Sequence, residues 1–395
     1  MASGDYLKYA READYEPQTL FLDSGDAFGL EEELRRLGTR RIMFLCNQVT
    51  VKFKGTTDLI DFYNDKGFRC FKYVRKEHFL NETDILGGLG VYKEFNCDTI
   101  ITIGGTADID CGKLIAAAAV NPVKEISEFE GINKLKKDIS VLCCIVTDNS
   151  AAPTTLFAEY FDTKYNRWIL CMSSYLIPQI VVVDTDFSVR TEMAWALGSS
   201  FSALACAVEA YINPTAKFNP PYRANAVNAC YSIFTNIKKL KDDPDDSYAR
   251  RLLSVGGLYS GIASRMFGLG YAHIITNSLI SRFGVAYAAY HLPLLTKAME
   301  IYTEKFKNDL SSLSRELHLC TMSSSTESAA STFVAGLRRI TDMTEYSIPP
   351  VELTDAEITR IADDARRDAA IYGLHTFETK DLVLIMKETF ERISS

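Results

Sequence analysis

The first 190 residues alternate short apolar runs with longer amphipathic stretches, and this alternation restricts the fold more than any other feature. The apolar runs are rich in β-branched and aromatic residues, as buried strands are. The stretches between them have helical spacing, which is typical of βαβ units. We therefore predict a mainly parallel sheet with strands at 40–46, 71–75, 97–105, 140–147 and 179–184.

The second half of the chain has no such strand signals and consists of long helical runs. These runs cover 195–212, 224–240, 250–268, 291–317, 355–371 and 378–393. The segment 219–225 and the pair Pro349-Pro350 are predicted to be turns between helices. The sequence thus predicts an α/β domain over 1–190 and an all-helical domain over 191–395.

Charge and cysteine content restrict the partners and the cellular compartment that we expect for the protein. The net charge of -8 comes from acidic and basic residues mixed along the chain, which disfavours a nucleic acid or a membrane surface as partner. The N-terminal sequence is charged, and no stretch approaches the roughly 20 apolar residues of a membrane span. The ten cysteines form no CxxC pair. We expect a cytoplasmic protein with reduced thiols.

The run IITIGGTADIDCGKLIAAAA (100–119) is predicted to be a buried strand, a glycine turn and a helix. Gly104 and Gly105 let the backbone approach a phosphate, and the free amides at a helix start favour an anion. This favours the pyrophosphate of a dinucleotide. The alternative is that the glycines are needed only for the backbone geometry of a strand-to-helix turn.

This run resembles the GGGSxxDxxK motif of the iron-containing (group III) alcohol dehydrogenases, which have the dehydroquinate synthase-like fold. Thr106 and Ala107 depart from the motif, whereas four positions match it: Gly104, Gly105, Asp110 and Lys113. The resemblance continues through 173–188, 202–216, 261–273 and 283–295. It implies a Rossmann-like α/β domain followed by an all-α domain, and a homodimer formed through the N-terminal domain.

The resemblance also implies a metal site, most of which this sequence replaces. The family's Asp position is Ser202, and its first His position is Cys206. His273 matches a liganding histidine, and the last histidine falls at Phe283 or Gly284. A hydroxyl and an aromatic ring are poor ligands for a hard divalent cation. We therefore expect no tightly bound metal.

Three interpretations of this degenerate site are open. Cys206 and His273 can be ordinary buried residues. The protein can instead be a metal-free reductase in which Ser202, Cys206 or His273 supplies the hydrogen bond or proton, with His273 best suited by its pKa. In the third, Cys206 is a nucleophile with His273 as base, although the sequence shows no group that would orient the histidine.

By the resemblance, the cofactor would contact Asn47, Gly104, Gly105, Thr106, Asp110, Thr147, Ser150 and Arg167. Asn47 stands where members that prefer NAD have an acidic residue, so NADP is slightly preferred over NAD, with Lys52 and Lys54 as partners of its 2′-phosphate. The loop at 145–155 lacks the family's glycines, which disfavours a close backbone approach. Alternatively, Asn47 is a turn residue, Asp110 caps a helix and Arg167 is a surface charge.

The resemblance implies an NAD(P)-dependent oxidoreductase that acts on a carbonyl or alcohol, here without a catalytic metal. An apolar or aromatic small molecule is the expected substrate, because the cleft walls would include Phe201, Tyr271, Phe283 and Tyr287. The alternative is a repurposed, non-redox member that uses the interdomain cleft. Such a member would be a cofactor-independent enzyme, or a catalytically silent binding or scaffold subunit.

Overall fold

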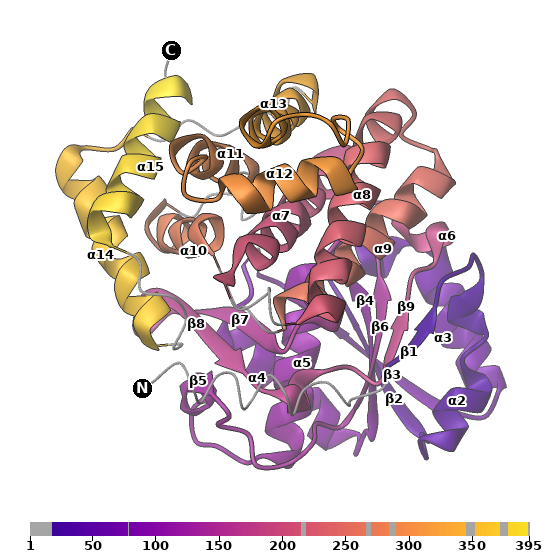
Figure 1. Cartoon of the computed structure of the whole chain (residues 1–395). Coiled ribbons are helices and arrows are strands. Elements are labelled where there is room, and N and C mark those ends of the chain that lie inside the picture. The colour runs from indigo at the N-terminus through magenta and orange to yellow at the C-terminus, as the bar shows by residue number, and fades with distance from the viewer. Residues whose placement is uncertain are drawn as a thin grey trace. The chain divides into compact units, whose positions relative to one another are not determined.

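The computed structural model describes residues 18–77, 79–214, 219–265, 270–283, 290–344, 352–371 and 378–393. The chain forms two compact units (Figure 1). The α/β unit contains the described residues up to 192 together with 245–258, and the helical unit contains those of 193–244 and from 259 onward. The α/β and all-helical fold class predicted from the sequence is confirmed.

A six-stranded parallel sheet forms the centre of the α/β unit. Its strand order is β1-β9-β6-β4-β2-β3. The five predicted strands are confirmed, and the short β1 adds a sixth at one edge. The bounds are β1 (Thr19–Phe21), β2 (Arg41–Cys46), β3 (Arg69–Val74), β4 (Thr99–Gly104), β6 (Val141–Val146) and β9 (Ile180–Val182).

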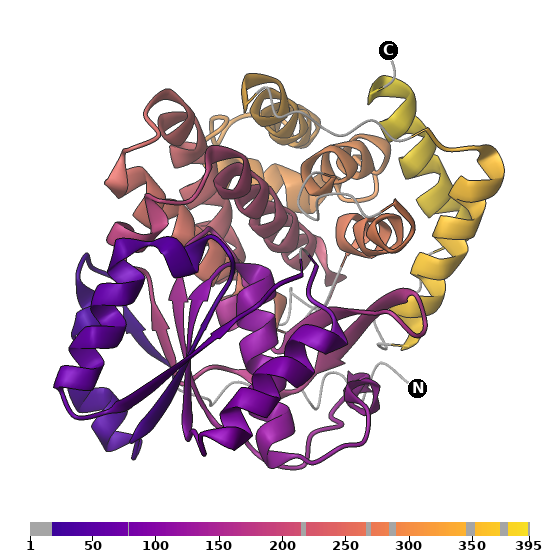
Figure 2. The same ribbon diagram turned by 180° about the vertical axis from the view of Figure 1, so that it is seen from behind.

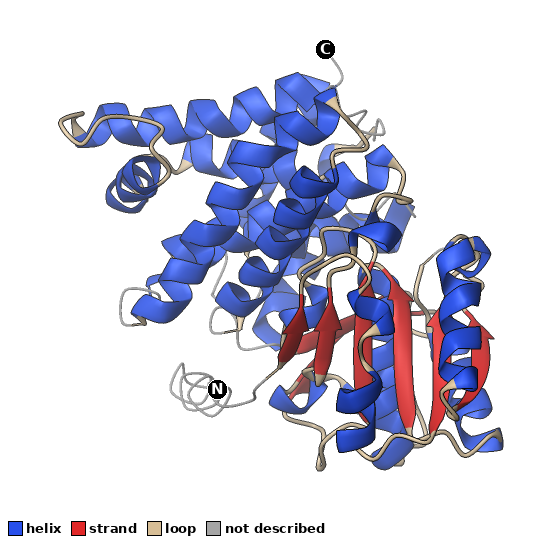
Figure 3. Ribbon diagram, turned by 90° about the vertical axis from the view of Figure 1, so that its right-hand side faces the viewer, coloured by secondary structure: helices blue, strands red, loops and turns tan. Residues whose placement is uncertain are grey.

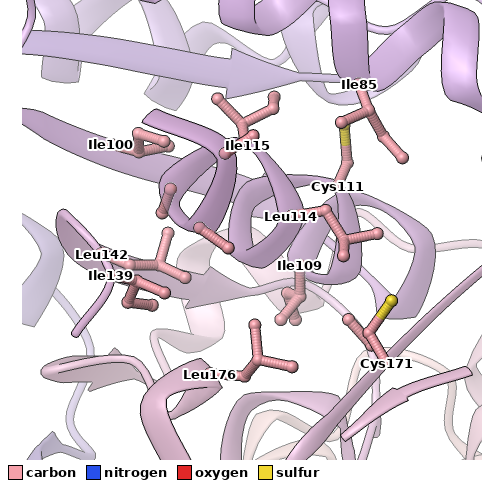
Figure 4. Packing of buried hydrophobic residues seen from close by; sticks show 14 of the residues in the cluster. Ile85, Ile100, Ile109, Cys111, Leu114, Ile115, Ile139, Leu142, Cys171 and Leu176 are labelled. Atoms are coloured by element: carbon pink, nitrogen blue, oxygen red, sulfur yellow. The ribbon is translucent and has the colours of Figure 1, made fainter. Parts of the chain in front are cut away.

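Helices cover both faces of this sheet, as Figure 3 shows with strands in red and helices in blue. Alternate residues of each strand point to opposite faces, so the sheet supplies two cores. One core packs Phe44 and Ile101 with α2 (Glu31–Arg36) and α3 (Lys54–Asp65). The other packs against α4 (Glu82–Glu94) and α5 (Thr106–Val120). In Figure 4, Ile109, Leu114 and Ile115 of α5 lie near Ile100 and Leu142 of the sheet.

A second, three-stranded sheet was not predicted from the sequence. Its order is β5-β8-β7, and β7 runs antiparallel to β8. It packs Ala158, Tyr160 and Ile169 into the same core as α5. Helix α5 is therefore covered on several sides, which explains why its sequence is apolar nearly all round. The bounds are β5 (Gly131–Ile132), β7 (Phe157–Asp162) and β8 (Arg167–Met172).

The helical unit is built around α7 (Met193–Ile212), which is buried over most of its length. Among the described residues, this helix alone is long and apolar enough to cross a membrane, but 78% of its apolar window is buried inside the protein, as in a core helix. Figures 1 and 2 show α14 and α15, in yellow, side by side. The other bounds are α6 (Thr185–Ser188, in the α/β unit), α8 (Pro220–Asp242), α9 (Ser247–Ser264, of which the part up to 258 belongs to the α/β unit), α10 (Tyr271–Phe283), α11 (His291–Ile301), α12 (Lys307–Glu316), α13 (Thr326–Thr344), α14 (Asp355–Ile371) and α15 (Thr379–Ile393).

Three predictions about this half need correction or completion. Residues 220–225 are not a turn but the start of α8, because proline is tolerated in a first helical turn, where no amide donor is needed. The predicted run 291–317 is two helices, α11 and α12, separated by turns. Helices α10 and α13 were not predicted. Pro349-Pro350 lies outside the described residues.

Candidate functional site

Helices α7 and α10 bring a serine, a cysteine, a glutamate and a histidine together in the helical unit. Ser202, Cys206 and Glu209 are four and three residues apart, so they share one face of α7. His273 lies in the first turn of α10. Its Nε2 is 3.2 Å from the Cys206 sulfur and 3.4 Å from the Ser202 hydroxyl, and its Nδ1 is 3.4 Å from a Glu209 carboxylate oxygen. The three predicted catalytic residues are thus adjacent.

Glu209 is fixed at the beginning of α10. One of its oxygens accepts a hydrogen bond from the Ala272 amide at 2.7 Å, and the other faces His273. A carboxylate is favoured there because free amides and the helix dipole make the start of a helix positive. A Cβ atom on Gly270 would lie 2.2 Å from the Glu209 carboxyl carbon, so only glycine leaves room for this contact.

The position of Glu209 determines which nitrogen of His273 carries the proton. A carboxylate only accepts hydrogen bonds, so Nδ1 must donate. Nε2 then accepts from the hydroxyl or thiol when the imidazole is neutral, and donates to them when it is charged. Burial lowers the pKa of His273, but the negative charges of Cys206 and Glu209 outweigh this effect and hold the pKa well above its usual value. The cluster can therefore accept and deliver a proton.

The ring of a second histidine, which the sequence analysis did not select, lies beside this cluster. The buried His291 on α11 has its ring centroid 4.2 Å from that of His273. It therefore forms part of the packing that holds the His273 ring in place.

The described residues do not fit the family's metal site. Ser202 offers only a neutral hydroxyl, and the Glu209 carboxylate is already held by the Ala272 amide. No three His, Cys, Asp or Glu side chains are placed to hold a metal ion in the part of the chain that the structure describes. Gly284 and the side chain of Phe283, the candidate positions of the last ligand, lie outside that part.

The predicted glycine turn lies between β4 and α5 in the α/β unit. Carboxylates of the protein itself occupy the space that the two glycines leave open. A Cβ atom on Gly104 would be 2.0 Å from an Asp108 oxygen, and one on Gly105 would be 2.3 Å from an Asp148 oxygen. Gly104 and Gly105 therefore allow a group to come close to the backbone, and in this structure that group is a carboxylate side chain of the protein.

Asp108 is held by a network of hydrogen bonds in this turn. It accepts from the Gly105 amide at 3.2 Å, from the Asn47 side-chain amide at 2.7 Å and from Arg75 at 2.9 Å. The Asn47 oxygen in turn accepts from the amides of Val49 and Thr50. Asn47, predicted to face the cofactor ribose, thus orders the turn after β2 and contacts Asp108.

Asp148 extends from the loop after β6 toward the same turn. One of its oxygens accepts from the Ser150 amide at 3.0 Å, and the Ser150 hydroxyl is 2.7 Å from that of Thr106. Burial and the nearby charge of Asp108 raise the pKa of Asp148 to about 7, although hydrogen bonds from backbone amides oppose the shift. A pyrophosphate at the start of α5 would meet both carboxylates in this arrangement, and protonation of Asp148 would remove one of the two opposing charges.

Asp110 and Lys113, which match the family motif, lie in the interior of the α/β unit. One Asp110 oxygen accepts from the Glu159 amide at 3.2 Å, and the other is buried without a hydrogen bond. Burial raises the pKa of Asp110 to about 7, although the charge of Lys113 opposes the shift. Lys113 donates to the carbonyls of Ala152, Thr155 and Phe157 at 2.6 to 3.1 Å. It thereby attaches α5 to the segment before β7.

The remaining predicted residues do not join one cluster. The Thr147 amide donates to the Gly104 carbonyl at 3.1 Å, which holds the loop after β6 against the glycine turn. Arg167 forms a two-pronged ion pair with Glu130 at 2.6 and 2.7 Å, beside the small sheet. Lys54 pairs with Asp58, and Lys52 lies in the turn before α3.

The residues predicted to line the substrate site are only partly described. Phe201 is buried in α7, and Tyr271 stacks on Tyr302 with ring centroids 5.7 Å apart. Tyr287 and the side chain of Phe283 lie outside the described residues.

Glu209 and Asp148 are among the residues of these clusters that sequence reasoning missed. Glu209 could have been found from the sequence. It is a glutamate in a nearly uncharged helix, three positions after Cys206 on the same face. A carboxylate is costly to bury without a partner, so a partner was to be expected. Asp148 had no comparable signal, since Asp is common in loops.

Models of known families match nearly the whole chain. The model described as iron-containing alcohol dehydrogenase matches residues 17–185. The model for the C-terminal part of the Fe-containing alcohol dehydrogenase family matches residues 196–390.

Individual relatives are more distant. The chain is 26% identical over 199 residues to an NAD-dependent methanol dehydrogenase of Bacillus methanolicus, covering 50% of this chain and 51% of that protein. It is 22% identical over 285 residues to lactaldehyde reductase of Escherichia coli K12, covering 71% and 73%. The matches to several curated relatives, the methanol dehydrogenase among them, span only about half of their length.

Solved structures share the fold along the whole chain. A 1,3-propanediol oxidoreductase superposes with a TM-score of 0.87 at 20% identity, covering 95% of this chain and 98% of the other. An alcohol dehydrogenase from Oenococcus oeni superposes with a TM-score of 0.86 at 19% identity, covering 94% and 98%. These structures show the fold, and the two family models, which together match most of the chain, establish that it belongs to the iron-containing alcohol dehydrogenase family.

Proposed function

We propose that the protein is an NAD(P)-dependent oxidoreductase that interconverts a carbonyl compound and an alcohol without a catalytic metal. Membership of the family over both halves of the chain supports the oxidoreductase class. The cluster of Ser202, Cys206, Glu209 and His273 supports proton transfer by side chains in place of polarisation by a metal.

The chain's own part of this reaction is the movement of a proton. A nicotinamide supplies the hydride in enzymes of this class, and the oxygen of the reduced carbonyl then needs a proton. His273 carries one on Nε2 when charged, and Ser202 or Cys206 can pass it on because both contact that nitrogen. Glu209 stabilises the charged imidazole before the proton leaves. In alcohol oxidation the same groups accept the proton.

Several further properties belong to this proposal. Either dinucleotide can serve, with NADP slightly preferred because Asn47 carries no charge that repels a 2′-phosphate. The substrate is a small, apolar or aromatic carbonyl compound, and neither a nucleic acid nor a membrane is a partner. The protein works in the cytoplasm as a homodimer. All ten cysteines are free thiols in the structure, which suits a reducing compartment.

A fluorescence titration of metal-analysed protein with NADPH, and separately with NADH, tests the proposal. We expect saturable binding below millimolar concentration, with no stoichiometric metal. Cofactor oxidation on addition of small aldehydes should follow. If neither dinucleotide binds, the oxidoreductase proposal fails, and the non-redox alternative takes its place.

A further inference from the structure

We propose that Asp148 contacts the diphosphate of the dinucleotide as a protonated acid, so that the protein takes up one proton when the dinucleotide binds. The inference rests on the proposed function for the presence of a dinucleotide. The geometry of the glycine turn between β4 and α5, and of the loop after β6, carries the rest. Both segments belong to the α/β unit.

The Asp148 carboxyl group lies in the space that Gly105 leaves open at the start of α5. An ideal Cβ atom on Gly105 would be 2.3 Å from Oδ2 of Asp148 and 2.9 Å from its carboxyl carbon. Gly105 is the N-cap of α5, a helix of 15 residues, and the amides at such a helix start favour a negative charge. A phosphate group bound at this helix start would therefore lie against the Asp148 side chain.

The two oxygens of Asp148 have different surroundings. Oδ1 accepts a hydrogen bond from the Ser150 amide at 3.0 Å, so a proton on this carboxyl group belongs on Oδ2. Oδ2 is also the oxygen that lies closer to Gly105. A protonated carboxyl group donates one hydrogen bond, and its O–H group would face the glycine turn. Neutral Asp148 is therefore a suitable partner for a phosphate oxygen, whereas charged Asp148 repels it.

The neighbouring carboxylate, Asp108, is stabilised in its charged form. Arg75, Asn47 and the Gly105 amide all donate hydrogen bonds to it, at 2.9, 2.7 and 3.2 Å. Burial and the like charge of Asp108 instead raise the pKa of Asp148 to about 7, although backbone amides oppose the shift. Asp148 is thus the carboxyl group of this pair that takes a proton near neutral pH.

The backbone around Asp148 is held in place on both sides. The Thr147 amide donates to the Gly104 carbonyl at 3.1 Å, and the Ser254 hydroxyl of α9 donates to the Asp148 carbonyl at 3.1 Å. From α5 the carboxyl group faces the charged Asp108, and from α9 the contact is with the neutral Ser254. The side chain can therefore gain or lose a proton without an opening of the loop.

Proton uptake gives dinucleotide binding a direction with pH. In the free protein Asp148 is mostly neutral at pH 6 and mostly charged at pH 8, because its pKa is about 7. Only the neutral form suits a diphosphate, so the Kd should be about tenfold lower at pH 6 than at pH 8. At pH 8 the protein should take up about 0.9 proton for each ligand bound.

The first experiment titrates the protein with ADP-ribose by isothermal titration calorimetry at pH 8. ADP-ribose is a diphosphate diester without nicotinamide, and its own charge does not change between pH 6 and pH 8. Runs in two buffers of different ionisation enthalpy give the number of protons taken up. We expect about 0.9 in the wild type and none in Asp148→Asn. Uptake that persists in Asp148→Asn would assign the proton to another group, such as Asp110, and would overturn the inference.

Two variants separate the charge of Asp148 from its hydrogen bond. Asp148→Asn has no charge and its amide donates as the neutral acid does, so it should bind at pH 8 as tightly as the wild type binds at pH 6. Asp148→Ala has neither group, so its Kd at pH 6 should be about tenfold higher than that of the wild type. Asp138→Asn, at an exposed position of the same unit, is the control and should match the wild type at both pH values. Equal Kd values at pH 6 for the wild type and Asp148→Ala, both folded by thermal melting, would overturn the inference.

The outcomes separate this inference from the proposed function. Binding of ADP-ribose without proton uptake overturns the inference and leaves the proposed function standing. Proton uptake that depends on Asp148, with no carbonyl reduction by NADPH, supports the inference and rejects the proposed function. If neither the wild type nor Asp148→Asn binds ADP-ribose at pH 6, both fail.

Discussion

The start of α5 and the α7–α10 cluster differ in how their buried carboxylates are partnered. At the start of α5, Asp108 and Asp148 lie on the two glycines, so their charges oppose an anionic ligand. In the α7–α10 cluster, Cys206 and Glu209 instead contact the two ring nitrogens of His273. The carboxylates of the first region oppose an anionic ligand, whereas the side chains of the second region pair with one another.

The surroundings of the two regions stabilise the charge of the Glu209 carboxylate and disfavour that of the Asp148 carboxylate. The Glu209 carboxylate has a helix start and an imidazole as partners. Asp148 has another carboxylate nearby, and its pKa is raised to about 7 because burial and Asp108 both disfavour its charge. Near neutral pH, the charge of the glycine turn is therefore adjustable.

The largest expected effect concerns the proton donor. His273→Asn should reduce carbonyl reduction by about 10²- to 10⁴-fold, the usual contribution of general acid catalysis. The dinucleotide Kd should be nearly unchanged, because the residue acts on the proton. Steady-state kinetics with NADPH and a small aldehyde measure the effect, and Ser202→Ala is the milder companion. Wild-type kcat in a folded His273→Asn protein would remove His273 from the mechanism.

The buried Asp110 should make stability depend on pH. Its pKa in the folded protein is raised to about 7, so folding favours the neutral form. That contribution is complete below pH about 4 and is lost as the pH rises through about 7. Asp110→Asn should therefore stabilise the protein by about 1–3 kcal/mol at pH 8 and have little effect at pH 4. Thermal melting across this range checks it.

The control for Asp110 is the exposed Asp138 in the same unit. Asp138→Asn should change the melting temperature little at either pH. A stabilisation by Asp110→Asn that is the same at pH 4 and pH 8 would contradict the raised pKa.

Gly270 tests whether Glu209 needs its close contact with α10. Gly270→Ala places a methyl group 2.2 Å from the Glu209 carboxyl carbon, so the carboxylate must move. We expect a loss of about 1–3 kcal/mol in the free energy of unfolding, measured by denaturant titration, as for overpacking in a core. Gly90→Ala in α4 is the matched control. A Cβ atom there meets nothing within 4 Å, so the helix should gain stability.

The smallest expected effect concerns Asp148 and dinucleotide binding. Protonation of Asp148 removes one charge that opposes a pyrophosphate, so NADH should bind more tightly as the pH falls through about 7. Asp148→Asn should tighten binding at pH 8 by about tenfold, equivalent to about 1.4 kcal/mol, and remove the pH dependence. Fluorescence titration at pH 6 and pH 8 measures both. Equal affinity of wild type and variant at pH 8 would show that Asp148 does not oppose the cofactor.

Much of the fold could be predicted because hydrophobic periodicity reports which face of an element is buried. The parallel strands and most long helices follow from it. The small sheet, α10 and α13 were not predicted. Strand β8 (Arg167–Met172) is as apolar as a central strand, but nothing local shows that it pairs with β7 rather than the main sheet.

The candidate sites were less predictable, because their chemistry depends on tertiary contacts. The grouping of Ser202, Cys206 and His273 in one site was implied by the resemblance to the family, and the structure brings these residues together. Glu209 was overlooked although it shares their helix face, and its role depends on a glycine 61 positions later in the chain. Asn47 and Arg167 were assigned to a cofactor by position, whereas their contacts are with Asp108 and Glu130.

Carbonyl reduction by metal-depleted protein tests the central claim most directly. The protein is dialysed against a chelator, its metal content is measured, and NADPH oxidation with a small aldehyde is followed before and after addition of Fe²⁺ or Zn²⁺. If the Cys206–His273–Glu209 cluster replaces the metal, as we propose, activity survives chelation and does not rise with added metal. Activity that disappears with the metal and returns with it would contradict the claim.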